Sequence, residues 1–146
     1  MQKIISVPYI DQTEQYPTGC ESISAVMMLQ YLGYDITPEQ FIDCFLYKRD
    51  FEFHDGYLYG PHPADAFIGS PYNDEKGSYG CYAPVIALAM ERAAGEDYRF
   101  TARQGVPMET LLEEYIDKDM PVVFWATLNM EPSSPGVTWR LLGRNG

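Results

Sequence analysis

The pattern of apolar and polar positions predicts two helices in the first third of the chain. Residues 20–32 are apolar on nearly every side of a helical wheel, which is typical of a buried central helix. Gly33 follows as the expected left-handed stop. Thr18 and Glu21 have the spacing of a capping box, in which each side chain bonds a free backbone N–H of the first turn. Residues 37–46 begin with a second capping box and predict a short helix.

The second half of the chain contains two more predicted helices. Residues 83–94 are predicted to form a helix that ends at Gly95. Residues 107–118 have an amphipathic pattern and predict a helix with one apolar face. The residues expected to face the core are Leu111, Leu112, Tyr115 and Ile116.

Four segments have patterns typical of strands. Residues 4–10 predict an edge strand or an extended lead-in, because the segment contains a proline. Residues 98–102 and 137–142 are short segments with strand composition. Residues 121–128 contain a continuous apolar run, which is typical of a strand buried on both faces.

Residues 47–82 differ in composition from the rest of the chain. This segment contains half of the 12 tyrosines and shows no sustained helical or strand period. Long irregular loops in a compact domain tend to be functional or disordered, and the aromatic content favours order. We therefore expect a loop that walls part of a substrate cleft, with Tyr57 and Tyr59 contacting the substrate.

Composition and charge narrow the classes of partner. The 146 residues, 46% of them apolar, provide for one α+β domain, which we expect to span residues 1–146. The net charge of −11 argues against nucleic acid and anionic membrane surfaces as partners. No apolar run is long enough to span a membrane, and no secretory leader is visible. No nucleotide-binding fingerprint occurs, so we expect no cofactor.

The cysteines and histidines suggest neither a metal site nor a disulfide framework. Cys20, Cys44 and Cys81 are odd in number and form no C-x-x-C pair. His54 and His62 lack a third ligand nearby in the sequence, so we expect no metal site. Cys44 and Cys81 are expected to be buried structural thiols.

Cys20 is the strongest candidate for chemistry. It falls in the first turn of a predicted helix, where free N–H groups and the helix dipole favour a thiolate. Gly19 leaves room for a substrate backbone to approach. Gln12 lies in a polar loop that folds back near the helix start, where its amide can stabilise an oxyanion. The spacing alone is equally compatible with a buried, inert Cys20 and a solvated Gln12.

Several blocks of sequence resemble one family of bacterial enzymes. The blocks are residues 7–12, 16–27, 80–86 and 121–127. They closely resemble blocks of the cysteine peptidases related to the double-glycine leader peptidases of bacteriocin exporters, which have a papain-like fold. The resemblance spans nearly the whole chain. It implies that Cys20 is the nucleophile and that Gln12 is the oxyanion glutamine.

The chain departs from this family at the general base. A cysteine peptidase needs a histidine to take the thiol proton and a further residue to orient that histidine. The resemblance places the histidine on a strand beyond residues 121–128, where this chain reaches residues 143–146. Neither His54 nor His62 lies on a matching segment. The chain is then a C-terminally incomplete fragment, which we favour, a catalytically dead relative, or a protein that has recruited one of these two histidines.

The sequence therefore predicts a papain-like α+β fold, with the nucleophile helix packed on an antiparallel sheet whose C-terminal part is missing. The expected activity is hydrolysis of a peptide bond through a thioester on Cys20, silent in this chain without the histidine-bearing segment. The alternatives are a non-catalytic peptide-binding module and a Cys-dependent amidase or acyltransferase. We expect a peptide or protein substrate and self-association through the open sheet edge. The resemblance implies a location outside a bacterial cell or on its surface.

Overall fold

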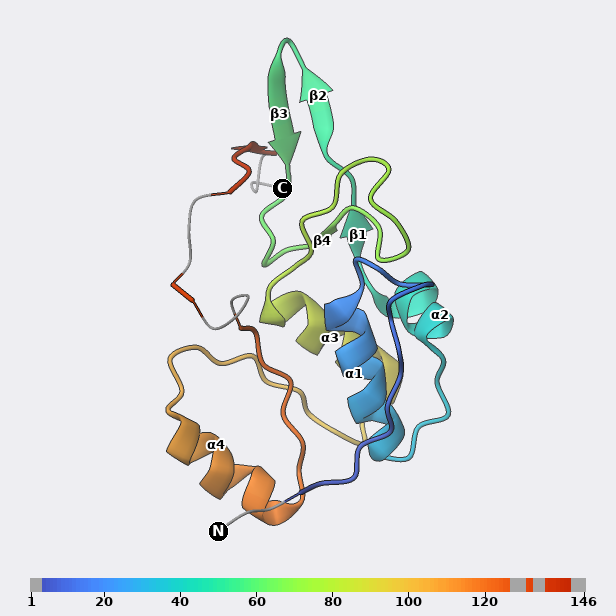
Figure 1. Cartoon of the computed structure of the whole chain (residues 1–146), viewed down its shortest axis with the longest axis vertical. Helices are drawn as coiled ribbons and strands as arrows, with labels where there is room; N and C mark the ends of the chain where they lie inside the picture. The colour runs from blue at the N-terminus through green and yellow to red at the C-terminus, as the bar shows by residue number, and fades with distance from the viewer. Residues whose placement is uncertain (1–3, 127–130, 133–135, 143–146) are drawn as a thin grey trace.

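The chain folds into a mixed arrangement of helices and short strands. A computed structural model describes residues 4–126, 131–132 and 136–142. Its helices are α1 (Cys20–Tyr31), α2 (Pro38–Gln40), the π-helix η1 (Phe41–Phe45), α3 (Ala83–Ala94), α4 (Met108–Glu114) and the 3-10 helix η2 (Ile116–Lys118). Its strands are β1 (Lys48–Arg49), β2 (Glu52–His54), β3 (Tyr57–Gly60), β4 (Phe67–Ile68) and β5 (Arg140–Leu141). Figure 1 shows α1 at the centre, the β2–β3 hairpin at one end of the long axis and α4 near the other.

The central helix α1 is buried, as its sequence predicts. It packs closely against α2, η1 and α3. Its buried apolar residues are Ile23, Ala25, Val26 and Leu29. The helix ends at the expected place, because Gly33 adopts a φ of +99° that a residue with a side chain rarely takes. Local sequence signals therefore fix this helix and its end.

The predicted cap at the start of α1 does not form. The N-cap residue is Gly19, and no side chain caps the helix. The Thr18 hydroxyl donates instead to the carbonyl of Ser70, and the Glu21 carboxylate accepts the N–H of Cys81. The Thr18 and Glu21 side chains thus bond to residues distant in the sequence, and neither bonds to the free N–H groups of the first turn of α1. The capping-box prediction was wrong, although the helix begins only one residue later than that box implies.

The second capping box is confirmed. The Thr37 hydroxyl accepts the Gln40 N–H at 3.1 Å, and the Gln40 side chain accepts the Thr37 N–H at 2.9 Å. The short α2 then continues into η1, where Phe41 and Ile42 are fully buried. Cys44 in the same element is exposed, so its predicted place in the core was wrong. The neighbouring phenylalanine and isoleucine fill the core at this point.

Residues 47–82 contain four short strands, not the irregular loop that the sequence predicts. β1 pairs in parallel with β4. β3 pairs antiparallel with β2 and parallel with β5. The turn between β2 and β3 consists of Asp55 and Gly56, both at positive φ, which suits a two-residue hairpin loop. In the described part of the chain, α1 packs closely on helices, and the expected antiparallel sheet beneath it is not seen.

Residues 98–126, which we call the arm, carry no buried side chain. Two predicted strands, at 98–102 and over 121–126, do not form here, because neither segment has a neighbouring strand with which to share backbone hydrogen bonds. Residues 127–128 of the second prediction lie outside the described residues. The predicted helix forms as α4 and η2, but α4 packs closely only on η2. Leu112, expected to face the core, is 43% exposed.

The remaining elements follow the sequence in part. Helix α3 has the predicted bounds and ends at Gly95, whose φ is +70°. Residues 4–10 form an extended lead-in without strand pairing, and residues 137–142 contain only the two-residue strand β5. Within the described ranges, no helix is both long and apolar enough to cross a membrane.

Candidate active site

Cys20 is the first residue of α1 and is exposed. The residue before it, Gly19, is buried between Tyr16 and Pro71. A Cβ atom at Gly19 would lie 3.2 Å from the Cβ atoms of both neighbours. Close packing of the helix start is therefore sufficient reason for a glycine at this position, and its predicted contact with a substrate backbone stays a prediction.

The Gln12 side chain lies close to the start of α1. Its Nε2 atom donates to the carbonyl oxygen of Tyr16 at 3.5 Å. The same carbonyl accepts the backbone N–H of Gly19 at 3.0 Å. One oxygen atom thus joins the Gln12 amide to the residue that precedes Cys20. The fold thus places the Gln12 side chain near the residue that precedes Cys20, and the roles of Gln12 and Cys20 stay predictions.

The Cys20 thiol bonds to the carboxylate of the next residue. Its S–H group donates to Glu21 Oε1 at 2.9 Å. Partial burial, followed by the hydrogen bond and the negative charge of Glu21, raises the pKa of Cys20 to about 11. The sequence argument expected the helix N-terminus to favour a thiolate. In the structure the pKa of Cys20 is raised instead, because partial burial and, after it, the Glu21 carboxylate both disfavour the charged thiolate.

The second oxygen of the Glu21 carboxylate holds the turn before α3. Oε2 accepts the Cys81 backbone N–H at 3.0 Å. The Cys81 carbonyl in turn accepts the indole N–H of Trp125 at 2.9 Å. Cys81 is buried, as predicted, and this burial raises the pKa of its thiol. Sequence reasoning missed this role of Glu21 because its partner lies 60 residues away.

Neither histidine bonds to the candidate nucleophile. His54 is exposed on β2, with its Nε2 atom 3.5 Å from a carboxylate oxygen of Glu52. His62 is half-buried, its Nδ1 atom accepts the Ala64 N–H, and its ring packs edge-on against Tyr82. The two histidines of the chain are both within the described ranges. Neither histidine is therefore in place to take the proton of the Cys20 thiol.

The predicted substrate-binding tyrosines lie on the β2–β3 hairpin. The guanidinium of Arg140 lies 3.6 Å from the ring centroid of Tyr57, and the Tyr59 ring is 5.9 Å from the ring of His54. The structure thus brings Tyr57 and Tyr59 together with strands β2 and β5. No bond links either tyrosine to Cys20 in the described part of the chain, and their contact with a substrate stays a prediction.

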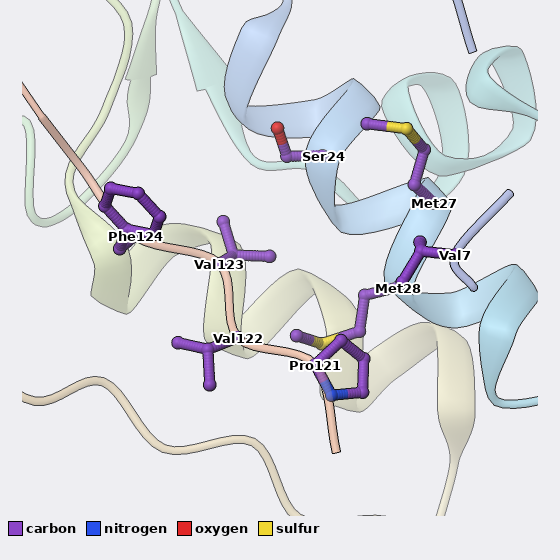
Figure 2. A pocket seen from close by; sticks show the side chains of 8 residues that line it. All are labelled: Val7, Ser24, Met27, Met28, Pro121, Val122, Val123 and Phe124. Atoms are coloured by element: carbon purple, nitrogen blue, oxygen red, sulfur yellow. The ribbon is translucent and has the colours of Figure 1, made fainter. Parts of the chain in front are cut away.

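A shallow groove lies between α1 and residues 121–124 of the arm. Figure 2 shows Met27 and Met28 of α1 beside Val7 of the lead-in, with Val122, Val123 and Phe124 of the arm facing them. The groove has a volume of about 230 Å³ and is completed by Ser24 and Pro121. Its walls are mainly apolar. Over the residues that the structure describes, no group of three or more His, Cys, Asp or Glu side chains could hold a metal ion.

Comparison with known proteins places the chain in a family. The sequence profile of the Peptidase_C39 like family matches residues 4–140. A crystal structure from Bacillus anthracis, described as a C39-like peptidase, matches with a TM-score of 0.55 and 28% sequence identity. That match covers 64% of this chain and 46% of the other, so this chain spans less than half of that neighbour. A search of curated proteins gave no significant match. With the profile matching almost every residue between 4 and 140, the chain belongs to the Peptidase_C39 like family.

Proposed function

We propose that the chain is a single domain, residues 1–146, of a papain-like cysteine peptidase that cleaves a peptide bond with Cys20 as nucleophile. The observation that carries this proposal is the exposed Cys20 at the start of α1, with the Gln12 amide joined to the same helix start through one carbonyl. Membership of the Peptidase_C39 like family supports it. Gln12 and the backbone N–H of Cys20 are the proposed oxyanion donors.

The proposed reaction needs a histidine as general base, and neither His54 nor His62 is bonded to the Cys20 sulfur. Attack on the peptide carbonyl forms a C–S bond only after the thiol proton has left, and the amine then departs with a proton. In the structure the S–H group faces a carboxylate, and its pKa is raised to about 11. We therefore propose that these 146 residues alone hold Cys20 in a resting state. Hydrolysis would require a histidine at the sulfur, where neither His54 nor His62 is bonded in this structure.

The resting state is tested by the pH dependence of Cys20 alkylation with iodoacetamide, followed by peptide mapping. Only the thiolate reacts, so the rate should rise about tenfold per pH unit towards a midpoint at about pH 11. The exposed Cys44 serves as a reference thiol in the same sample. Rapid labelling that persists at about pH 5.5 would contradict the proposal and reveal a cationic partner. Repeating it with His54→Ala and His62→Ala would then identify that partner.

The oxyanion role of Gln12 is tested by comparing acylation with alkylation. An activated ester such as p-nitrophenyl acetate passes through an oxyanion when it acylates Cys20, whereas iodoacetamide does not. Gln12→Ala should slow acylation by about 100-fold to 1,000-fold and leave alkylation unchanged. Gln15→Ala is the matched control, because Gln15 is an exposed residue of the same loop. Equal acylation rates in both variants would exclude an oxyanion role for Gln12.

The protonated thiol also favours a second function, that of a non-catalytic peptide-binding module. Such a module would bind a peptide with equal affinity after Cys20→Ser, and Tyr57→Ala with Tyr59→Ala would weaken that binding.

A Cys-dependent amidase or acyltransferase would use the same Cys20 and Gln12, and product analysis would distinguish it from a peptidase. Self-association through an open sheet edge is a separate proposal, tested by sedimentation velocity at increasing protein concentration.

A further inference from the structure

The Glu21 carboxylate occupies a position between two backbone segments that are far apart in the sequence. One oxygen accepts the Cys20 S–H at 2.9 Å and the other accepts the Cys81 N–H at 3.0 Å. The side chain therefore spans from the start of α1 to the turn before α3. Hydrogen bonds to a charged carboxylate are stronger than bonds between neutral groups, so each of the two contacts helps to hold the side chain in place.

The turn at Gly80 leaves room for the Glu21 carboxylate, because the glycine has no side chain. Gly80 has a φ of +98°, and the place where its Cβ would lie is taken by the Glu21 carboxylate. Gly80 also pairs with Ile68 of β4, which fixes the turn on its other side. The Cys81 carbonyl is held by Trp125 of the arm. Glu21 thus docks against a turn whose N–H and carbonyl are both bonded.

We propose that Glu21 is a positioning residue that clamps the Cys20 thiol in a resting orientation against the Gly80–Cys81 turn. The inference deepens the proposed function, on which it rests, by giving that site a means of control. Among the described residues, the Glu21 carboxylate acts on the Cys20 thiol, and both of these groups act on the buried Cys81 thiol. Withdrawal of the carboxylate from the sulfur frees the S–H group for a base. Of the two bonds, only the one to Cys20 has to break.

The first test removes the charge and keeps the shape. Glu21→Gln retains an oxygen that can accept the Cys81 N–H, while the negative charge beside the sulfur is lost. Cys20 alkylation by iodoacetamide at about pH 8 should become faster, by about tenfold for each unit by which the pKa of Cys20 falls, because the thiolate fraction rises by that factor. Glu14→Gln, which removes one charge from an exposed loop residue, should leave the rate unchanged. An unchanged Cys20 rate in folded Glu21→Gln would overturn the clamp.

The second test displaces the carboxylate without altering it, and it applies even if Glu21→Gln fails to fold. Gly80→Ala places a Cβ where the Glu21 carboxylate lies. Gly33→Ala is the matched control, because Gly33 has a nearly identical φ of +99° and its Cβ would meet nothing within 4 Å beyond its chain neighbours. Gly80→Ala should accelerate Cys20 alkylation, and Gly33→Ala should not. Equal rates in the two variants would overturn the clamp.

The bond to Cys81 has a readout of its own. Glu21→Ala removes both acceptor oxygens, so hydrogen exchange at the Cys81 amide should accelerate, whereas Glu21→Gln should preserve its protection. Equal protection in wild type and Glu21→Ala would contradict the clamp.

Alkylation by iodoacetamide needs no catalytic base and no oxyanion donor. Failure of Gln12→Ala to slow acylation therefore bears only on the proposed function, and failure of Glu21→Gln to speed alkylation bears only on the clamp.

Discussion

Two regions of similar apolar content differ sharply in how they pack. The body, residues 20–94, contains a core of buried side chains between α1, η1 and α3, with Leu29, Phe41 and Phe67 at 0% exposure. The arm, residues 98–126, has no buried residue, and Phe124 in it is 63% exposed. An apolar segment is fully buried only where other elements cover it: helices cover α1, whereas residues of the arm are at most partly buried.

Hydrogen bonds and ring contacts join the arm to the body, and Phe100 of the arm packs against the core. The Trp125 indole donates to the Cys81 carbonyl at 2.9 Å. The Tyr31 hydroxyl of α1 donates to the Asp119 carbonyl at 2.6 Å. The groove of Figure 2 lies between residues 121–124 of the arm and the face of α1. The arm therefore contacts the body through exposed and partly buried side chains, while the body contains the clusters of fully buried side chains.

The largest predicted effect contrasts a leucine of the body with a leucine of the arm. Leu29→Ala should lower the free energy of unfolding by about 2–5 kcal/mol, because it empties space in a filled core. Leu112→Ala should change it by less than about 0.5 kcal/mol, because the side chain is already 43% exposed. Urea denaturation followed by circular dichroism measures both. A similar loss in the two variants would contradict the division into body and arm.

Elements that depend on local signals were predictable from the sequence. The bounds of α3 and the end of α1 follow from apolar periodicity and from the glycines that stop each helix. The capping box at Thr37 formed because its two partners are three residues apart. The hairpin was missed, although Asp55-Gly56 between two strand-forming segments is a strong hairpin signal that was available in the sequence.

Elements that depend on distant partners were not predictable. Residues 121–126 have strand composition, but a strand exists only beside another strand, and none of the described strands pairs with them. Thr18 and Glu21 have capping-box spacing, yet Ser70 and Cys81 compete for them from more than 50 residues away. In the candidate site, Cys20 and Gln12 were found from their type and spacing, while Glu21 required the three-dimensional structure.

The next effect concerns the bond that joins arm to body. Trp125→Phe removes the indole donor to Cys81, which should cost about 1 kcal/mol and accelerate hydrogen exchange across residues 121–126. Trp139→Phe is the matched control, because its indole also donates to a backbone carbonyl, that of Pro61, at 3.0 Å. Exchange in the arm should be unchanged in that control. An equal response to both substitutions would show that the arm is anchored elsewhere.

The smallest effect lies within the arm itself. Arg103 and Glu114 form an ion pair at 2.9 Å, with side chains that are 42% and 50% exposed. Glu114→Gln should change the free energy of unfolding by less than about 0.5 kcal/mol, and added salt should reduce even this difference. Glu113→Gln, an exposed neighbour, is the control. The argument turns on cooperativity, because a bond in the arm contributes to global stability only if the arm unfolds together with the body. A loss above about 1 kcal/mol in Glu114→Gln alone would therefore show that arm and body unfold as one unit, in spite of their different packing.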